Sequence, residues 1–553
     1  MAQRKKTYPW EKTYPADITW DIDISPRPVF SLLEKSAAKF PDNLCMEFMG
    51  KEYTYLETFN LANKVAEGLQ HSGVTKGTRV GLMMPNCPYF TICYYAILKI
   101  GGIVVNFNPL YSISELAEQV KDSGASFLVT IDNVMLYEKT AKLLQTTPLE
   151  KAVIGSLAKM LPFPKNMLFK LLKRNEIASV HYGKINIELE SFFNLEGKSK
   201  PVDINPDDVA VLQYTGGTTG TPKGAILTHA NIYINAKQCS AWFAKLEEGK
   251  ERVMAVLPFF HVFAMTGVMN FSILNGFAML LVPKFSISHL IEDIQNKKPT
   301  ILPGVPRIFA EINKFADLAK YDLSSLKACV AGGAQLPLEI KHKFEEVSGC
   351  KLIEGYGLTE CAPVAAANPL FGENKEGSIG LPLPGTIIEI REIDGKNKLV
   401  KEGEAGEICI IGPQVMQGYW NKDDETKKVL KSGRLHTGDL GYMDSDGYIF
   451  IIDRIKEIII TSGFNVYPRE IEELLYKHVA IEEAAVIGIP DDCKGEKIKA
   501  FIKLTPQSSL SKKQIHEYLE GKLAKYKLPE EIEFVSELPR TLIGKIAKKE
   551  LKK

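Results

Sequence analysis

The sequence predicts an α/β fold in which a large N-terminal domain of parallel-rich sheets and helices is followed by a small α+β domain. Through most of the chain, short apolar, β-rich runs alternate with longer helical patterns, for example at residues 79–84, 102–106, 126–130 and 327–331. Strands that are apolar on both faces and separated by helices are typical of parallel sheets. The chain has 553 residues, which is too long for one ordinary hydrophobic core.

The pattern changes twice toward the C-terminus. From residue 377 to about 411, apolar and polar residues alternate between Gly/Pro turns, which predicts a β-rich subdomain. A sharper break follows near Asp453, and the residues beyond it predict a helix at 470–477, a strand at 484–488 and a helix at 511–525. We therefore expect an N-terminal domain of residues 1–453, a hinge at 454–456 and a C-terminal domain of residues 457–553.

The composition excludes several classes of function. Hydrophobic residues make up 45% and charged residues 24% of the chain, as in a soluble globular protein. Lys and Arg number 68 against 67 Asp and Glu, so no global field selects nucleic acid, and no nucleic-acid partner is expected. The sequence also lacks a kinase loop set and the G-x-S-x-G elbow that a hydrolase would need.

The cysteines and the N-terminus predict a cytoplasmic protein. The nine cysteines include no C-x-x-C pair, which argues against a zinc site and a disulfide framework. The first six residues are charged but are followed by TYPWEK rather than an apolar run, so they do not predict a signal peptide. No segment reaches the roughly 18 apolar residues of a membrane-spanning helix.

Residues 159–174 form a basic and apolar segment. It carries five positive charges, no negative charge and many large apolar residues. One interpretation is peripheral contact with an anionic membrane at the inner face, with lysines near the lipid headgroups and Leu and Phe buried. The other interpretation, to which we give equal weight, is an ordinary surface helix docked on the domain.

The strongest local signal is the run YTGGTTGTPKG at residues 214–224, which lies between the apolar runs 209–212 and 225–228. A loop rich in Gly and Thr can wrap polyphosphate, because glycine lets backbone N–H groups approach it and hydroxyls add donors. Lys223 adds positive charge. The loop is not a Walker A motif, since Lys223 follows Pro222 rather than a glycine.

Further motifs follow in chain order: LPFFHVF at 257–263, AGGAQLP at 331–337, GYGLTE at 355–360, HTGD at 436–439, DRIK at 453–456 and PRTLIGK at 539–545. Together with the loop, they resemble the acid-side, adenine-side, adenine and metal, ribose, hinge and catalytic-lysine signatures of the adenylate-forming superfamily. This superfamily contains acyl-CoA synthetases, peptide-synthetase adenylation domains and luciferases. The resemblance covers nearly the whole chain.

The resemblance implies a ligase that joins a carboxylate to AMP, using ATP and Mg²⁺, and then transfers the acyl group to CoA. It implies catalytic roles for Lys545, Lys223, His261 and Glu360. It implies nucleotide contacts from Thr215, Gly216, Gly217, Thr218, Thr219, Gly220, Gly333, Ala334, Gly355, Tyr356, Gly357, Thr359, Asp439 and Arg454, with Thr215 and Glu360 holding the metal. By the same resemblance Lys456 is the hinge of a mobile C-terminal domain, and Ser462, Gly463 and Phe464 lie on the loop that faces the CoA thiol after rotation.

Physical chemistry supports a charge-neutralising site. Attack of a carboxylate on the α-phosphate brings two anions together. From the local sequence alone, Lys545 would be one lysine of a basic tail, and His261 would be a hydrogen-bonded residue of the core. The resemblance instead implies catalytic roles for both residues. His261 is expected to position the carboxylate rather than to act as a base, because a fatty carboxylate is already ionised at neutral pH.

Several stretches are most similar to bacterial long-chain fatty-acyl-CoA synthetases, namely residues 14–17, 84–86, 103–111, 122–126 and 462–468. The apolar residues 259–271 and 276–282 suit an alkyl chain and offer no partner for a second carboxylate. The open alternatives are a medium-chain or dicarboxylate–CoA ligase, a fatty acyl-AMP ligase that loads a carrier protein, and a catalytically silent adenylate sensor. Related proteins include monomers and homodimers, so the oligomeric state also stays open.

Overall fold

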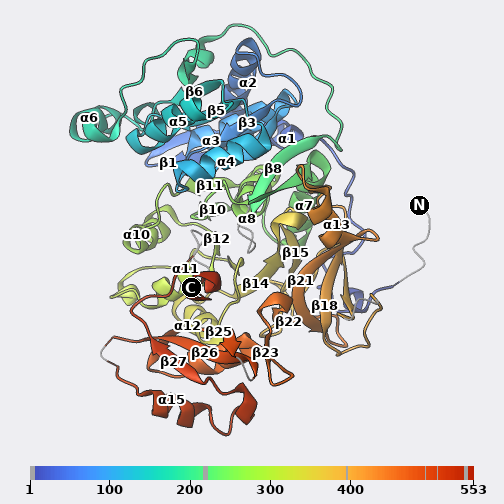
Figure 1. Cartoon of the computed structure of the whole chain (residues 1–553). Coiled ribbons are helices and arrows are strands. Elements are labelled where there is room, and N and C mark those ends of the chain that lie inside the picture. The colour runs from blue at the N-terminus through green and yellow to red at the C-terminus, as the bar shows by residue number, and fades with distance from the viewer. Residues whose placement is uncertain are drawn as a thin grey trace.

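The computed structural model describes residues 7–215, 222–393, 397–491, 494–506, 508–540 and 546–552. These residues form four β-sheets, two large and two small. Figure 1 shows the N-terminal sheet and its helices at one end of the molecule and the C-terminal domain at the other, with the C-terminus between them. The alternation of apolar runs with helical patterns therefore produces the α/β fold that the sequence predicts.

The first large sheet has eight strands and is mainly parallel. Its strands are, in spatial order, β19 (Gly418–Tyr419), β9 (Lys223–Thr228), β8 (Val209–Thr215), β4 (Ile103–Asn106), β3 (Arg79–Leu82), β5 (Phe127–Ile131), β6 (Lys151–Gly155) and β7 (Asn186–Glu188). Helices α2 (Tyr55–His71) and α3 (Pro88–Lys99) belong to one hydrophobic core, and α4 (Ile113–Ser123) and α5 (Val134–Thr146) to another. Both faces are thus covered, as expected for a parallel sheet.

The second large sheet has nine strands. Their spatial order is β16 (Leu381–Pro382), β15 (Val364–Ala367), β14 (Leu352–Gly357), β13 (Ala328–Ala331), β12 (Ile301–Gly304), β10 (Arg252–Ala255), β11 (Ala278–Leu281), β1 (Leu44–Phe48) and β2 (Lys51–Thr54). Its helices are α1 (Phe30–Lys39), α7 (His229–Trp242), α8 (Val262–Ala264), the π-helical turn η5 (Met265–Asn270), α9 (Phe271–Asn275), α10 (Ile287–Lys297), α11 (Pro306–Asn313) and α12 (Leu338–Ser348). One large hydrophobic core contains buried residues of both sheets. Helix α3 lies in this core, and all its residues from Pro88 to Leu98 are buried.

Short polar signals in the sequence begin several of these helices. Thr54, Ser112 and Thr228 each accept a hydrogen bond from the backbone N–H three residues later, at the start of α2, α4 and α7. Such N-caps satisfy backbone donors that have no partner within the helix. At its C-terminal end, α4 stops at Gly124, which has a φ of 64° that favours glycine.

Two small sheets complete the fold. The β-rich subdomain contains β17 (Ile387–Arg391), β18 (Gly406–Ile411), β20 (Leu430–Lys431), β21 (Arg434–Met443) and β22 (Ile449–Arg454), with α13 (Asp423–Val429) beside them. The C-terminal domain contains β23 (Ile459–Thr461), β24 (Phe464–Val466), α14 (Pro468–Tyr476), β25 (Ile481–Asp491), β26 (Gly495–Leu504), α15 (Lys512–Leu519) and β27 (Glu531–Phe534). It has a hydrophobic core of its own, from Ile459 to Ile532.

Two sequence predictions differ from the structure. The helix expected at 511–525 ends at Leu519, because Glu520 leaves the helical conformation and Gly521 has a φ of 78°. The β-rich subdomain expected from 377 to about 411 extends to Arg454. Beyond residue 411, the glycines in β21 and the loops between the strands interrupt the alternation of apolar and polar residues. The alternation therefore does not show that the subdomain continues.

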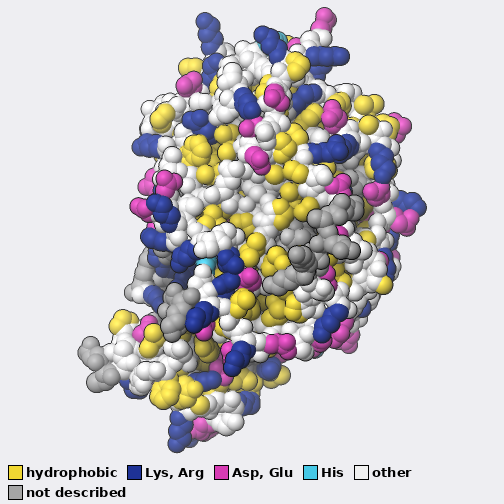
Figure 2. Space-filling model, turned by 90° about the vertical axis from the view of Figure 1, so that its right-hand side faces the viewer, with side chains coloured by type: hydrophobic (Ala, Val, Ile, Leu, Met, Phe, Trp, Pro, Cys, Tyr) yellow, Lys and Arg dark blue, Asp and Glu magenta, His cyan; other side chains and the backbone are white. Residues whose placement is uncertain are grey.

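The basic segment 159–174 forms the short turn η2 (Ala158–Met160) and the helix α6 (Lys165–Leu172), at the outer edge of the molecule (Figure 1). Among the described residues, no helix has the length and hydropathy needed to cross a membrane. On the face shown in Figure 2, basic and acidic side chains are interspersed rather than gathered into one field.

Candidate active site

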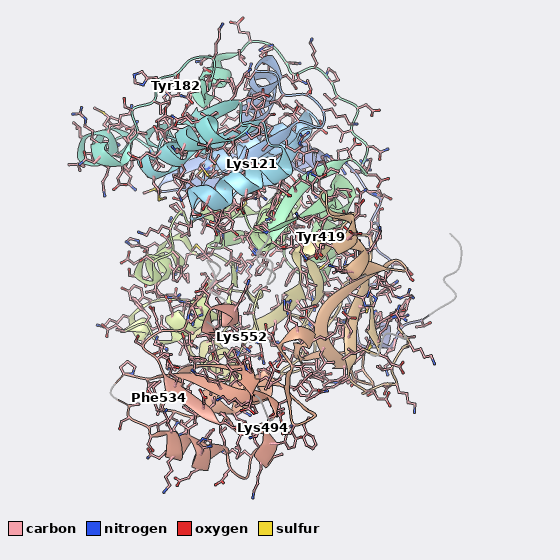
Figure 3. All side chains as sticks on the ribbon, in the orientation of Figure 1. Lys121, Tyr182, Tyr419, Lys494, Phe534 and Lys552 are labelled. Carbon is pink, nitrogen blue, oxygen red and sulfur yellow. The ribbon has the colours of Figure 1, made fainter. Side chains whose placement is uncertain are left out.

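A cavity of about 1930 Å³ lies between the two large sheets, the β-rich subdomain and the C-terminal domain. Its walls come from segments far apart in the chain. Tyr419 and Lys552 both line it and both lie toward the middle of the molecule (Figure 3). The described residues that the sequence assigned to the site all line this cavity, except those of the loop at 462–464.

The phosphate side of the candidate site is a hairpin between β8 and β9. Thr215 ends β8 opposite Lys223, which begins β9, and both line the cavity. The predicted Gly216, Gly217, Thr218, Thr219 and Gly220 lie outside the described residues. The ammonium group of Lys223 forms an ion pair with Glu425 of α13 and lies 5.4 Å from the centre of the Tyr419 ring. Lys223 and Lys428 lower the pKa of Glu425 to about 2 by hydrogen bonding.

Two parallel neighbours, β13 and β14, form the adenine-side wall. Because their carboxyl ends meet at one edge of the sheet, Gly333 and Ala334 come close to Gly355 and Gly357, and all four line the cavity. Gly357 permits a close approach of two chain segments. A Cβ atom at this position would lie 1.9 Å from the carbonyl oxygen of Pro363, so a larger residue cannot fit without movement of the backbone.

Glu360 belongs to the short turn η7 (Thr359–Cys361), which directly follows β14. Its carboxylate accepts a hydrogen bond of 2.6 Å from the hydroxyl of Tyr419, and its backbone carbonyl accepts one of 2.8 Å from the N–H of Met416. Thr359 and Glu360 line the cavity together with Thr215. The cavity wall therefore includes one residue with a carboxylate and one with a hydroxyl, and such hard oxygen donors suit Mg²⁺.

The predicted ribose side is built on the pairing of β21 with β22. Asp439 and Arg454 lie opposite each other in this pair, and their carboxylate and guanidinium groups are 2.6 Å apart. Tyr356 donates a hydrogen bond of 2.6 Å to the second carboxylate oxygen of Asp439. The Asp439 side chain is 4% exposed, whereas that of Arg454 is 40% exposed. The carboxylate is thus held in one orientation by two partners at the cavity wall.

His261 precedes α8 at the apolar end of the cavity. Its Nδ1 accepts a hydrogen bond of 3.5 Å from the N–H of Phe263. The preceding loop is held by Asn86, which donates to the carbonyls of Ala255 and Leu257 and accepts from the N–H of Phe259. Beyond His261 the cavity is lined by uncharged side chains of α7, η5 and α9 and the loop after α7, namely Cys239, Trp242, Phe243, Leu246, Gly267 and Phe271.

The C-terminal domain presents a specific face to the cavity. Lys456, the predicted hinge residue, lines it, and burial, followed by the nearby Arg454, lowers the pKa of its amine. The predicted Lys545 lies outside the described residues, but Arg540 and Ile546 on either side of its segment both line the cavity. Ser462, Gly463 and Phe464 do not line it. Phe464 is 53% exposed and stacks on Tyr526 with ring centres 4.6 Å apart.

Polar contacts join the C-terminal domain to the N-terminal domain in this arrangement. Lys314 forms an ion pair of 2.7 Å with Glu482, and the Gln335 amide donates a hydrogen bond of 2.6 Å to Glu473. Glu354 of β14 faces Glu473 and Arg469 of α14. Burial raises the pKa of Glu354 to about 7, although the charge of Arg469 opposes this. The contact surface is therefore polar, as expected for domains that separate during a reaction cycle.

Sequence reasoning missed two groups that contact predicted site residues. Tyr419 binds Glu360, and Glu425 binds Lys223. Tyr419 reaches the site because β19 pairs with β9, more than 190 positions earlier in the chain. The adjacent aromatic residues at 419–420 are the only local feature that could have drawn attention to Tyr419, and they do not indicate a contact with Glu360.

Comparisons with known proteins agree with this geometry. A family model described as "AMP-binding enzyme" matches residues 33–420, and one described as "AMP-binding enzyme C-terminal domain" matches residues 470–545. A "Long-chain-fatty-acid--CoA ligase" from Bacillus subtilis (strain 168) is 44% identical over 547 residues, which cover 98% of this chain and 97% of the relative. A protein of the same name from Escherichia coli O157:H7 is 35% identical over 553 residues, with 98% and 97% covered.

Solved structures share the fold over nearly the whole chain. ATP-bound MatB from Rhodopseudomonas palustris has a TM-score of 0.84 and 26% identity, covering 95% of this chain and 98% of that one. The anthranilate CoA ligase AuaEII in complex with anthranoyl-AMP has a TM-score of 0.83 and 26% identity, covering 96% and 98%. The first of these structures holds a nucleoside triphosphate and the second an acyl adenylate.

Proposed function

The chain belongs to the AMP-binding enzyme family, and from this premise we propose that it is an AMP-forming long-chain fatty-acid–CoA ligase. In the first half-reaction, an oxygen of the fatty carboxylate attacks the α-phosphorus of ATP and pyrophosphate leaves, which yields acyl-AMP. In the second, the CoA thiolate attacks the acyl carbonyl and AMP leaves. The observation that carries this proposal is one cavity that joins a polar region to an apolar region, whose lining residues from α7, η5 and α9 carry no charge.

The polar region is suited to ATP. Lys223, Arg454 and Lys456 bring positive charge to its wall, and this charge would offset the anions that meet in the transition state. Asp439 is oriented to accept hydrogen bonds from the ribose hydroxyls, and Tyr356 offers an aromatic ring beside it. Mg²⁺ would be held by Thr215 and Glu360 and would neutralise phosphate charge.

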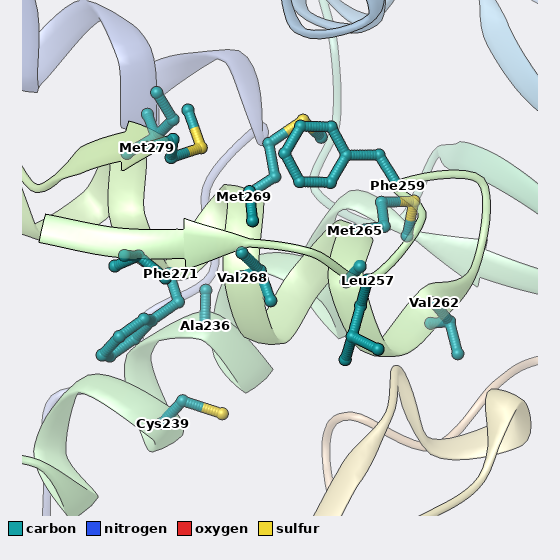
Figure 4. Close-up of a cluster of buried hydrophobic side chains, with 14 of the residues drawn as sticks. Ala236, Cys239, Leu257, Phe259, Val262, Met265, Val268, Met269, Phe271 and Met279 are labelled. Carbon is teal, nitrogen blue, oxygen red and sulfur yellow. The ribbon is translucent and has the colours of Figure 1, made fainter. Parts of the chain in front are cut away.

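The apolar region is suited to an alkyl chain. Figure 4 shows a cluster of buried hydrophobic side chains that includes Cys239 and Phe271, both of which line the cavity, together with Ala236 and Val268. A second carboxylate would have no cationic partner among the lining residues of α7, η5 and α9, and its burial would be costly. We therefore favour a long monocarboxylic acid over a dicarboxylic acid.

The position of the C-terminal domain supports the first half-reaction in this structure. The ends of the segment that carries Lys545 face the cavity, and the loop with Ser462, Gly463 and Phe464 lies outside it. We propose that rotation about Lys456 exchanges these two faces, so that the loop borders the path of the CoA thiol.

A panel of fatty acids tests the proposed function. We expect pyrophosphate release that depends on fatty acid without CoA, and acyl-CoA with AMP when CoA is present, with the highest kcat/KM for long chains. A preference for shorter or dicarboxylic acids would contradict the chain-length proposal. Transfer to a phosphopantetheinylated carrier protein but not to CoA would identify an acyl-AMP ligase. Absence of pyrophosphate release with every acid would leave only the adenylate-sensor interpretation.

We further propose that α6 contacts an anionic membrane. The apolar side chains Phe163, Met167, Leu168, Leu171 and Leu172 are between 50% and 77% exposed. Phe163 precedes the helix, and the spacing of the other four places them on one side of it. Phe169 packs against the large core on the other side. The basic residues Lys159, Lys165, Lys170, Lys173 and Arg174 flank this apolar stripe. This combination of an apolar stripe and flanking cations matches an anionic bilayer surface.

Vesicle binding tests the membrane contact. We expect the double variant Leu171→Ser/Leu172→Ser to lower the partition coefficient for phosphatidylglycerol-containing vesicles about tenfold or more, because two exposed leucines lose their apolar contribution. Leu399→Ser, at a 56% exposed leucine of the β-rich subdomain, should bind as the wild type does. Binding that is equal on pure phosphatidylcholine vesicles would contradict the role of charge. A double variant that changes the oligomeric state instead would indicate that α6 contacts a second copy of the chain.

A further inference from the structure

The ribose-side Asp439 lies on an irregular part of β21. Glu407 of β18 pairs with Leu440, and Cys409 pairs with His436, so three residues of β21 lie opposite the single Ile408. Extra residues in one strand of a pair form a bulge, which leaves backbone groups outside the regular hydrogen-bond ladder. The bulge consists of Thr437, Gly438 and Asp439, and it directs the Asp439 carboxylate toward Tyr356 and Arg454.

The backbone of this bulge is held by specific side chains. Thr437 donates a hydrogen bond of 2.7 Å to the carbonyl of Ile408, and its hydroxyl accepts one of 3.0 Å from the N–H of Asp439. Gly438 has a φ of 71°, a conformation that favours glycine. Its N–H donates a hydrogen bond of 3.0 Å to Oε1 of Glu407.

The other oxygen of the same carboxylate is also bound. Oε2 of Glu407 lies 2.7 Å from Nδ1 of His436, the residue directly before the bulge. Glu407 thus holds both ends of a three-residue stretch, from His436 to Gly438. Neither Glu407 nor His436 lines the cavity, whereas Thr437 and Asp439 do. The pair can therefore act on the nucleotide only through the residues of the bulge, of which Asp439 is the one with a carboxylate.

We infer that Glu407, together with His436, is a positioning residue that fixes Asp439 for the ribose hydroxyls. The inference rests on the proposed function of the cavity as an ATP site. Without Glu407, the Gly438 N–H and the His436 ring would lose their acceptor, and a buried donor without a partner is unfavourable. The bulge would relax, and the Asp439 carboxylate would no longer lie at a single position relative to the ribose.

Glu407, Cys409 and His436 also have the spacing of metal ligands, but the hydrogen-bonded arrangement explains them better. Nδ1 of His436 is already occupied by the Glu407 carboxylate. Sγ of Cys409 lies 3.5 Å from the same Nδ1, so the three groups contact one another directly. The cluster therefore serves the bulge.

The test is discrimination between ATP and 2′-deoxy-ATP in fatty-acid-dependent pyrophosphate release. We expect Glu407→Ala to raise the KM for ATP about tenfold or more, because small displacements of a positioning group are costly. The ratio of kcat/KM for ATP to that for 2′-deoxy-ATP should fall toward the ratio of Asp439→Ala. Glu407→Gln keeps an acceptor for Gly438 and a hydrogen-bonding partner for the His436 ring, so it should retain most of the discrimination.

Two controls separate the possible outcomes. Glu389→Gln removes another carboxylate of the same sheet, which binds Arg391 and Arg434 rather than the bulge, and it should leave discrimination unchanged. If Asp439→Ala discriminates as well as the wild type, the proposed ribose site itself is wrong. If Asp439→Ala loses discrimination and a folded Glu407→Ala keeps it, only the positioning role is overturned. If Glu407→Gln loses as much discrimination between ATP and 2′-deoxy-ATP as Glu407→Ala does, the negative charge of Glu407 is required, and the positioning role is contradicted.

Discussion

Replacement of Lys545 by alanine is expected to lower fatty-acid-dependent formation of acyl-AMP by a factor of about 10³, the upper range for loss of one charged group that stabilises the transition state. The reason is electrostatic. A carboxylate and an α-phosphate approach each other, and a lysine between them would offset their repulsion. Arg540 and Ile546, which flank the segment of Lys545, line the same cavity as Thr215 and Lys223.

The two half-reactions should respond differently to this change. Thioester formation from supplied acyl-AMP and CoA should stay within about threefold of the wild type, since the rotated domain no longer presents Lys545 to the site. Lys513→Ala, at a lysine that is 85% exposed on α15, controls for loss of a positive charge from the same domain. Equal losses in both half-reactions of a folded Lys545→Ala protein would contradict the proposal of two domain positions.

Replacement of Glu360 by alanine is expected to lower pyrophosphate release about 100-fold at limiting Mg²⁺ and to raise the Mg²⁺ concentration needed for half-maximal rate. Glu360 lines the cavity, and its carboxylate accepts a hydrogen bond from Tyr419, whose ring centre lies 5.4 Å from the ammonium group of Lys223. Loss of this carboxylate would leave Thr215 as the single proposed oxygen ligand. A Mg²⁺ titration of pyrophosphate release at saturating ATP and fatty acid measures the effect.

Tyr419→Phe provides a matched control for Glu360. It removes the hydroxyl that donates to Glu360 but keeps the ring and the carboxylate, so the Mg²⁺ requirement should change by about threefold or less. A Glu360→Ala protein with reduced activity and an unchanged Mg²⁺ titration would show that Glu360 supports the turn η7 rather than the metal. Restoration of the rate by high Mg²⁺ in Glu360→Ala would support the proposed role.

Much of the fold follows from local patterns. The strands at 79–82, 103–106 and 328–331 lie within the apolar runs that predict them, and the strand at 127–131 extends one residue beyond its run. Apolar runs between helices mark buried parallel strands because each strand must bury both faces. The helix expected at 511–525 was too long, since helical periodicity does not show where the backbone leaves the helix.

Some of the candidate site residues could be predicted from local sequence, and others could not. Glycines and hydroxyls in a short loop, and motifs such as GYGLTE and HTGD, are visible in the sequence because their residues are adjacent. Tyr419, Glu425 and Glu407 were not predicted, although each contacts a predicted residue or its neighbour. Their partners lie between 31 and 202 positions away in the chain, and no periodic pattern reports such pairs.

The sequence by itself determined the α/β class, the family and the residue types that nucleotide chemistry needs, because these depend on composition, spacing and adjacency. Only the tertiary structure decided that the ends of the phosphate loop, the ends of β13 and β14, and the flanks of Lys545 border one cavity. It also decided that the loop at 462–464 lies outside that cavity and that a bulge held by Glu407 presents Asp439. These are relations between distant segments, and they are set by sheet pairing and domain packing rather than by any local run of residues.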